Sequence, residues 1–258
     1  MSITRRDAVA LLAGASLLPT AALAVPKGLA LSQDRFDRDR GWGDSSAAAT
    51  MTLSAPGRSV ATREMEIRVL ETSGDGDLSI THFDTPRNLR GTKNQTHSFA
   101  TAPDDQWIFL PEAGKVRRIS SRNKSGAFLV SEFTFEDLSS FKVAKYDYTY
   151  EGAETVNGVS CHVVGQVPRY AHTGYSKVTV WLDEAHLRPL QTAFFDRRGK
   201  HFKTMTFDAY EVYEGRFWRA HAVEMSNLTN GKVTRMDFTD FRFGIGLSPR
   251  EFDPARLG

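Results

Sequence analysis

The chain has 258 residues, a formal net charge of +2 and a single cysteine, and 40% of its residues are hydrophobic. The near-neutral charge argues against a nucleic acid as partner, because proteins that bind nucleic acids carry a marked excess of basic residues. One cysteine excludes an intramolecular disulfide bond, and a chain of this length buries enough apolar surface to fold without one.

Residues 1–24 have the three parts of a cleaved signal peptide. The basic pair Arg5-Arg6 precedes the apolar run Ala8–Leu18, and the small-residue sequence Ala22–Ala24 follows. The apolar run is much shorter than the ~20 residues of a membrane-spanning helix. The arginine pair resembles a twin-arginine export signal, although an ordinary Sec signal fits the same residues. The sequence predicts an exported protein without a lipid anchor, because the only cysteine, Cys161, is far from the cleavage site.

The next segments contain two helical candidates on either side of a strand. Leu31–Trp42 is polar with unevenly spaced apolar residues, and Ser32 is a suitable N-cap for a short helix. Thr62–Leu70 alternates apolar and polar residues, as a half-buried strand does. Pro86–Gly91 places proline and glycine where a helical turn begins and ends.

Asp104–Pro111 is apolar on both faces of a predicted strand. Trp107 and Phe109 point to one face, and Ile108 and Leu110 point to the other. A central strand that is covered on both sides has this pattern. A strand with one face on the core and the other on a ligand cavity has it as well.

A basic segment follows, with five cations within ten positions: Lys115, Arg117, Arg118, Arg122 and Lys124. One interpretation is an edge strand that its charges keep soluble and unpaired. The other is a docking patch for an acidic partner or for anionic lipid head groups.

The rest of the chain is dominated by alternating segments. Gly126–Phe141 is the exception, since it is strongly apolar without a clear period. Strands are predicted in Ser176–Asp183, Thr204–Ala209 and Thr234–Asp240, and Asn157-Gly158 is a typical hairpin turn. We expect ten to twelve strands, a mainly β sandwich or barrel, and one domain over residues 25–258.

Catalytic and metal-binding motifs are absent from the sequence. It contains no G-x-S-x-G, no H-E-x-x-H and no glycine-rich phosphate loop. Cys161 and His162 are adjacent, so on a strand they point to opposite faces and cannot form a catalytic pair. We therefore expect no enzymatic activity, no catalytic residues, no cofactor and no metal.

Seven segments spread over the chain share features with one known family: Arg40–Trp42, Trp107–Pro111, Arg117–Ser120, Lys124–Phe128, Phe133–Leu138, Ser176–Asp183 and Thr239–Phe252. Together they resemble the LolA-like outer-membrane lipoprotein-sorting family. The central block, residues 117–138, is the most specific part of the resemblance. At Leu129–Phe133 the chain departs from the family pattern, which usually reads Met-Gly-Ser-Asp-Phe there.

The resemblance implies a half-open antiparallel β-barrel around an apolar cavity, with a few short lid helices in 31–42, 86–91 and 132–140. It also implies a periplasmic carrier that moves acylated lipoproteins or other lipids toward the outer membrane. An inner-membrane RND-type exporter is the expected partner, and a monomer is the expected state. An envelope sensor or interaction module of the same fold is the alternative, followed by an envelope hydrolase.

An acyl chain in water requires an apolar lining, because each buried methylene contributes ~0.8 kcal/mol. The residues expected to line the cavity or its lid are Met65, Ile67, Trp107, Phe109, Phe128, Leu129, Phe133, Phe135, Val180, Leu182, Met205, Phe207 and Phe238. For each of them an ordinary core position is the alternative, because apolar patterning does not distinguish a core from a cavity wall.

Overall fold

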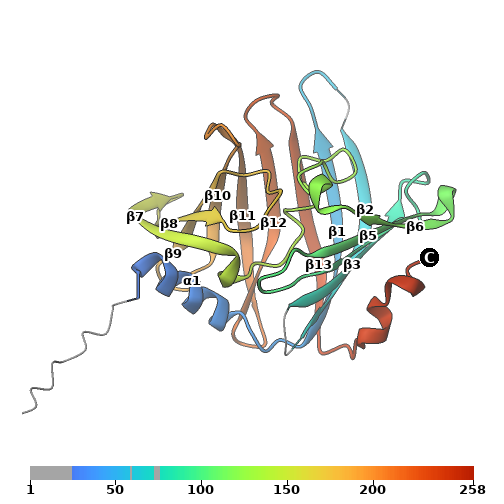
Figure 1. Ribbon diagram of the computed structural model, residues 1–258, viewed down its shortest axis with the longest axis horizontal. Coiled ribbons are helices and arrows are strands. Elements are labelled where there is room, and N and C mark those ends of the chain that lie inside the picture. The colour runs from blue at the N-terminus through green and yellow to red at the C-terminus, as the bar shows by residue number, and fades with distance from the viewer. Residues whose placement is uncertain (1–24, 59, 73–75) are drawn as a thin grey trace, which may run out of the picture.

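The computed structural model describes residues 25–58, 60–72 and 76–258, so the predicted signal peptide lies outside the described residues. The chain forms the helix α1 (Lys27–Arg38) and one antiparallel sheet of thirteen strands (Figure 1). The strands are β1 (Asp44–Ser54), β2 (Ala61–Glu71), β3 (Asp77–Thr85), β4 (Lys93–His97), β5 (Asp105–Leu110), β6 (Lys115–Ile119), β7 (Tyr146–Val156), β8 (Val159–Pro168), β9 (Lys177–Asp183), β10 (Pro189–Phe195), β11 (His201–Tyr213), β12 (Phe217–Asn227) and β13 (Val233–Phe243). Short 3-10 helices occupy Pro111–Ala113, Ser121–Asn123, Val143–Lys145, Pro249–Phe252 and Pro254–Arg256.

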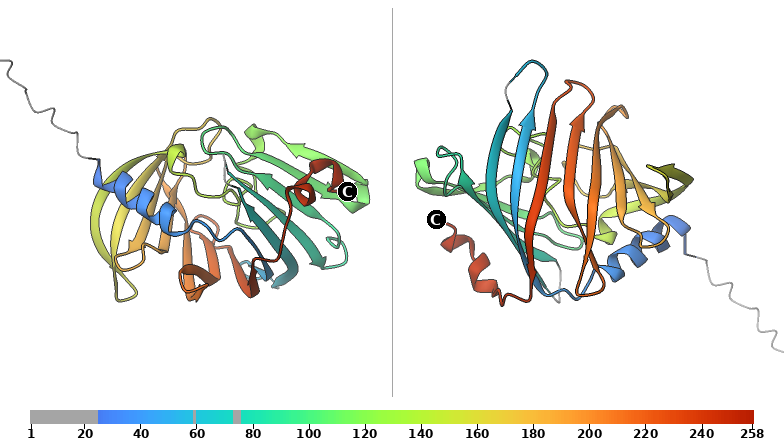
Figure 2. Two further views of the ribbon diagram at one scale, coloured as in Figure 1. Left: turned by 90° about the horizontal axis from the view of Figure 1, so that it is seen from below. Right: turned by 180° about the vertical axis from the view of Figure 1, so that it is seen from behind.

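The strands follow chain order across the sheet with one interruption. β1 lies inside the sheet, paired with β2 on one side and β13 on the other, and β6 and β7 are the two edge strands. The connection over residues 120–145 joins these edges. The sheet curves strongly, and among the described strands no ladder closes it between β6 and β7 (Figure 2). The predicted mainly β, half-open barrel is confirmed.

Alternation decides which side chains enter the concave face of the sheet. On β2, Met65 is buried whereas its neighbour Glu64 is exposed. Met65 stands opposite Ala49 of β1 and Phe83 of β3, and all three are buried in the core. This row across three strands is what a period of two produces when one face of a sheet is covered.

The predicted hairpin turn at Asn157-Gly158 is confirmed. Both residues have positive φ, 50° and 81°, and they join Val156 of β7 directly to Val159 of β8. This is the backbone of a type I′ turn, whose twist matches that of the strands it connects.

The segment over residues 120–145 fills the hollow of the sheet. Phe128 and Phe133 are only 1% and 4% exposed and belong to the main hydrophobic core together with residues from both halves of the sheet. The Glu132 backbone N–H donates to the Thr234 hydroxyl of β13 at 2.9 Å. The segment therefore acts as an interior plug that the sheet wraps.

The helical candidates have three different outcomes. The first is α1, which starts earlier than expected and ends before Trp42. Its residue Gly28 lies so close to β7 that a Cβ there would be 2.9 Å from the Thr149 carbonyl carbon. At 86–91 the chain makes one hydrogen-bonded turn, with the Arg90 N–H donating to the Pro86 carbonyl, rather than a helix.

The predicted lid helix over 132–140 is wrong, because this stretch consists of turns. The Thr134 N–H donates to the Asp137 carboxylate at 2.7 Å, and the Asp137 N–H donates to the Thr134 hydroxyl at 3.2 Å. This reciprocal pair is a capping box that closes a single turn, and the next hydrogen bond, from the Ser139 N–H to the Glu136 carbonyl at 3.3 Å, spans three residues rather than the four of an α-helix.

Candidate functional site

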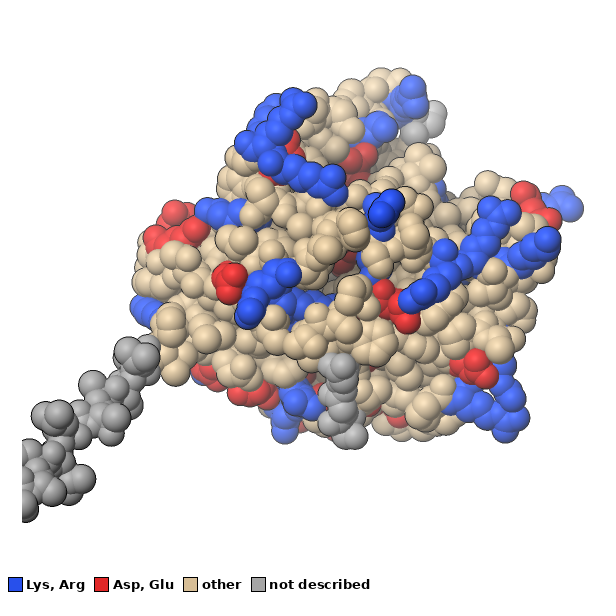
Figure 3. Space-filling model, in the orientation of Figure 1, with Lys and Arg blue, Asp and Glu red and all other residues tan. Residues whose placement is uncertain are grey.

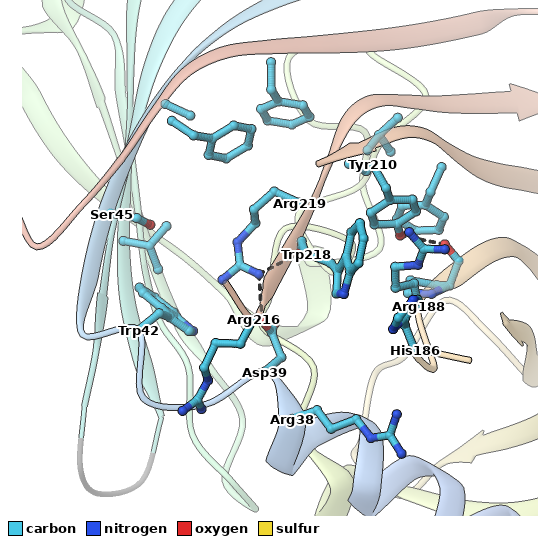
Figure 4. A pocket seen from close by; sticks show the side chains of 18 of the residues that line it. Arg38, Asp39, Trp42, Ser45, His186, Arg188, Tyr210, Arg216, Trp218 and Arg219 are labelled. Atoms are coloured by element: carbon cyan, nitrogen blue, oxygen red, sulfur yellow. Dashed lines mark hydrogen bonds and ion pairs between the residues drawn. The ribbon is translucent and has the colours of Figure 1, made fainter. Parts of the chain in front are cut away.

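A cavity of about 420 Å³ lies between the end of α1 and the concave face of the sheet. Its walls come from α1, β1, β2, β11, β12 and β13, together with the loop before β10 (Figure 4). A volume of this size is within the ~300–1,000 Å³ range of small-molecule sites.

The deep part of the cavity is apolar. A bulge in β13 helps to build it, since Asp240 has a φ of 53° and the β1–β13 register shifts between Ser46 and Ala48. In a regular strand, residues three apart point to opposite faces, but here the rings of Phe238 and Phe241 stack with centroids 5.9 Å apart. The apolar lining residues are Ala47, Ile67, Val69, Leu187, Phe207, Val223, Phe238 and Phe241.

The mouth of the cavity is strongly basic. Asp39 is the one carboxylate among the described lining residues, and it accepts a hydrogen bond from Arg219 at 2.6 Å. Figure 4 shows Arg216, Arg219 and Asp39 near one another beside Trp42. The basic lining residues are Arg35, Arg38, His186, Arg188, Arg216 and Arg219.

Arg188 lies at one side of the mouth, where three neighbouring side chains hold it in place. Its Nε donates to the Asp183 carboxylate at 2.9 Å, and its guanidinium lies 4.4 Å from the Trp218 ring centre and 4.9 Å from that of Tyr210. Burial would raise the pKa of Asp183, but hydrogen bonds from Arg188 and from the His186 backbone outweigh it and hold that pKa below its usual value. Arg188 is therefore already neutralised and packed.

Three of the predicted ligand-binding residues, Ile67, Phe207 and Phe238, line this cavity. The other predicted residues on the concave side lie in the main hydrophobic core or pack against it, and they belong to the plug or to the strands around it. The fully buried ones are Met65, Phe128, Phe133, Val180 and Leu182, and the partly buried ones are Leu129, Phe135 and Met205.

Trp107 and Phe109 lie on the outer face of the sheet, away from the cavity. The Trp107 ring contacts the His97 ring, with centroids 4.8 Å apart, and Gly258 lies against the Phe109 ring. The C-terminal segment covers this face, and Phe252, which is only 1% exposed, is anchored there by hydrogen bonds from Gln95 and His97 to its carbonyl oxygen. β5 is therefore apolar on both faces because both are covered.

The basic segment forms the edge strand β6 and the turn after it. Lys115, Arg117, Arg118 and Arg122 are exposed, and Arg118 pairs with Asp105. Lys124 is partly buried, donates to the Asp104 carbonyl oxygen, and has its pKa lowered by desolvation. Figure 3 shows basic side chains gathered over the end of the molecule that carries β6.

Sequence patterns did not reveal the aromatic and basic residues of the mouth. Trp42, Trp218 and Arg219 belong to segments that are far apart in the chain, and the Asp39–Arg219 pair joins residues 180 positions apart. The three arginines of Leu31–Trp42 are the only local sign, and by themselves they indicate an ordinary polar helix face.

The described residues offer little for covalent or metal chemistry. No group of three or more His, Cys, Asp or Glu side chains in the described ranges could hold a metal ion. Cys161 is fully buried, and burial raises the pKa of its thiol, which disfavours the thiolate that a nucleophile requires. None of the helices in the described part of the chain is long and apolar enough to cross a membrane.

Comparison with known proteins gives several matches over most of the chain. A protein-family profile described as an uncharacterized protein matches residues 75–258. A proposed outer membrane lipoprotein-sorting protein domain from Vibrio parahaemolyticus is 45% identical, with a TM-score of 0.88 over 90% of this chain and 98% of that one. A search of curated proteins gave no match.

Two further solved structures are similar. A DUF1329 family protein from Desulfovibrio piger is 27% identical, with a TM-score of 0.85 over 90% of this chain and 98% of that one. A LolA superfamily protein from Nitrosomonas europaea is 18% identical, with a TM-score of 0.71 over 89% of this chain and 98% of that one. The last similarity establishes a shared fold.

Proposed function

This chain belongs to the family of LolA-like outer-membrane lipoprotein-sorting proteins, and from that premise we propose that it is a periplasmic carrier of acyl chains. It holds the chains of lipoproteins or other lipids in the cavity beneath α1 and moves them toward the outer membrane. The predicted export signal and the absence of covalent machinery among the described residues are consistent with this role.

The observation that supports the proposal most directly is the apolar floor of the cavity. Phe207, Val223 and Phe238 present hydrocarbon surface to a space of about 420 Å³ inside the sheet. A long acyl chain exposes apolar surface worth on the order of 10 kcal/mol in water, at ~0.8 kcal/mol for each methylene. A carrier must cover most of that surface, and a concave sheet with an apolar inner face provides the cover.

The basic β6 edge is the proposed site of contact with a membrane or an exporter. Lys115, Arg117 and Arg122 are exposed and have no carboxylate partner among the described residues. Each basic residue near an anionic bilayer contributes ~1 kcal/mol of attraction, so three of them support transient binding that salt weakens. The expected partners are anionic head groups and an inner-membrane RND-type exporter, and the expected free state is a monomer.

The carrier proposal is tested by purifying the protein from the periplasm, extracting bound lipid and identifying it by mass spectrometry. We expect about one acyl lipid per chain. In Phe207→Asp the occupancy should fall at least tenfold, because a carboxylate in the cavity wall opposes an acyl chain. Phe207 is only partly buried and lies outside the main core, so this variant should still fold.

Phe109→Asp is the matched control. It introduces the same charge at another partly buried phenylalanine, which lies on the outer face of the sheet. We expect its lipid content to equal that of the wild-type protein. Wild-type protein without bound acyl lipid would contradict the carrier proposal, and co-purification of an inner-membrane protein with lipid-free protein would favour the sensor alternative.

A further inference from the structure

We infer that the cavity is built for an acidic amphiphile, in which a carboxylate or phosphate head group is attached to an acyl chain. The inference rests on the proposed carrier function and specifies its ligand. Arg35, Arg216 and Arg219 would hold the acidic group at the mouth, while the chain lies on the apolar floor.

The buried lysines of the described chain show how this protein normally neutralises a cation. Lys203 pairs with Asp137 at 2.6 Å, Lys142 pairs with Asp77 at 2.8 Å, and Lys145 pairs with Asp104. A cation that is withdrawn from water without a counter-ion is costly, so folded proteins supply one. Each of these three lysines has a carboxylate of its own.

Arg35 departs from this rule. It is partly buried at the end of α1, and no other described residue forms an ion pair or a hydrogen bond with its side chain. Its guanidinium lies over the Phe141 ring, 4.6 Å from the ring centre. Desolvation lowers the pKa of Arg35, and the attraction of Asp39 offsets that only in part, so an anion that reached Arg35 would relieve an unfavourable environment.

Two more arginines at the mouth are available to an anion. Arg216 is exposed, stacks on Phe217 and donates to the Arg40 carbonyl oxygen, but it has no carboxylate partner among the described residues. Arg219 pairs with Asp39, whose side chain is 54% exposed, so solvent competes with that pair. By contrast, Arg188 is fully engaged with the buried Asp183.

The chemistry of these groups selects the ligand class. Guanidinium groups bind carboxylates and phosphates through paired, charge-assisted hydrogen bonds. Fatty acids and phosphate-bearing lipids therefore fit a mouth with unneutralised arginines above an apolar floor. The ester, thioether and amide links of a lipoprotein's acylated end are uncharged and would leave these arginines without a counter-ion.

Three probes with the same twelve-carbon chain test the inference: dodecanoate, dodecyl phosphate and dodecanol. Their affinities for the purified, delipidated protein are measured by calorimetry below the micellar concentration. We expect at least one of the acids to bind tenfold or more tightly than the alcohol. The tighter of the two acids identifies the source, a fatty acid or a phosphate-bearing lipid.

The variants separate charge recognition from packing. Arg35→Gln and Arg216→Gln should each weaken binding of the acids about tenfold and leave dodecanol unchanged, since a hydrogen bond to a charged group is lost. Arg35→Lys keeps the charge but not the paired hydrogen bonds, so it should restore part of the affinity. Arg235→Gln is the control, because Arg235 is an exposed residue paired with Asp237 away from the cavity. If Arg35→Gln does not fold, the exposed Arg216 gives the same test.

The possible failures are distinguishable. Equal affinity for all three probes, or an equal loss for all three in Arg35→Gln, would overturn the inference and leave the carrier function standing. If none of the probes binds and the purified protein contains no acyl lipid, the carrier function itself is contradicted.

Discussion

At the scale of single residues, the departure from the family pattern has a structural meaning. Leu129 and Val130 have φ values of 46° and 67°, and the Ser131 N–H donates to the Phe128 carbonyl at 2.9 Å. These are the features of a type I′ turn, in which both central residues are left-handed. The family usually has glycine where this chain has Val130, and glycine adopts that conformation without a steric penalty.

Val130→Gly should therefore stabilise the protein. The Val130 side chain is 78% exposed, so its removal loses little packing, whereas a left-handed residue with a Cβ costs about 1–2 kcal/mol. Glycine loses more chain entropy on folding than valine, which offsets part of this gain. We therefore expect the free energy of unfolding, measured by urea denaturation, to rise by about 0.5–1 kcal/mol. Val159→Gly is the control, an exposed strand valine without positive φ, and it should be destabilising. A loss of stability in Val130→Gly would contradict the interpretation that the left-handed conformation of Val130 is unfavourable.

The buried pair of Lys203 and Asp137 gives a second prediction at this scale. Their side chains are 2% and 1% exposed, and Asp137 also accepts a hydrogen bond from the Tyr175 hydroxyl at 2.6 Å. Lys203→Met leaves a buried carboxylate without its cation and should reduce the free energy of unfolding by about 3–5 kcal/mol. Adding Asp137→Asn should recover part of that loss, because no unpaired charge then remains. Additive effects of the two changes would argue against the pairing.

At the scale of elements, the sequence predicted regular strands well and the plug poorly. Thr62–Leu70 and Thr234–Asp240 lie in strands because period-two alternation is a local property of a half-covered sheet. The plug has no such period, since Phe128 and Phe133 are placed by turns and by contacts with distant strands. Its structure depends on tertiary hydrogen bonds, such as that from Glu132 to Thr234, that no local pattern encodes.

The plug also contains a titratable group, Glu136, whose ionisation makes the stability of the protein depend on pH. Glu136 accepts hydrogen bonds from the Tyr170 hydroxyl at 2.7 Å and from the Gly174 N–H at 2.8 Å, but it has no cation partner among the described residues. Burial raises the pKa of Glu136 above its ordinary value of 4.5, and these hydrogen bonds oppose the shift only in part. The folded state therefore holds the Glu136 proton more tightly than the unfolded state.

This difference in proton affinity between the folded and unfolded states determines whether stability rises or falls with pH. Glu136 contributes stability that is fully present below about pH 4.5 and is lost as the pH rises through its folded pKa. Relative to Glu136→Gln, which has no proton to lose, the wild-type protein should become less stable between about pH 4.5 and 7. Urea denaturation of both proteins across this range measures the difference. A difference that does not change with pH would contradict the raised pKa.

At the scale of the whole molecule, the cavity could not be predicted from sequence patterns. It assembles residues from α1, β2 and β13, and the bulge at Asp240 reverses the face on which Phe241 would otherwise lie. Alternation correctly suggested apolar inner faces, which brought Ile67, Phe207 and Phe238 into the predicted set. It did not distinguish these from the core residues Met65 and Leu182, because both groups alternate alike.

Ligand binding should raise the stability of the whole molecule. A ligand that binds only the folded state adds about 2.7 kcal/mol at a concentration of 100 times its Kd. For a chain of this size, each kcal/mol corresponds to about 2–4 °C, so dodecanoate at that excess should raise Tm by roughly 5–10 °C. Differential scanning calorimetry measures the shift. The Tm of Phe207→Asp should rise very little on adding dodecanoate. A full shift in that variant would show that dodecanoate binds outside the cavity.

The open seam between β6 and β7 has a consequence for the width of the molecule. In a closed barrel, strand number and stagger together determine the diameter, so the lumen cannot widen without breaking a ladder. Among the described strands no hydrogen bond joins β6 to β7, and this constraint is absent. The hollow is instead spanned by side-chain contacts, such as the Lys203–Asp137 pair between β11 and the plug. Substitutions in the plug can therefore change the width of the hollow while all twelve ladders of the sheet stay intact.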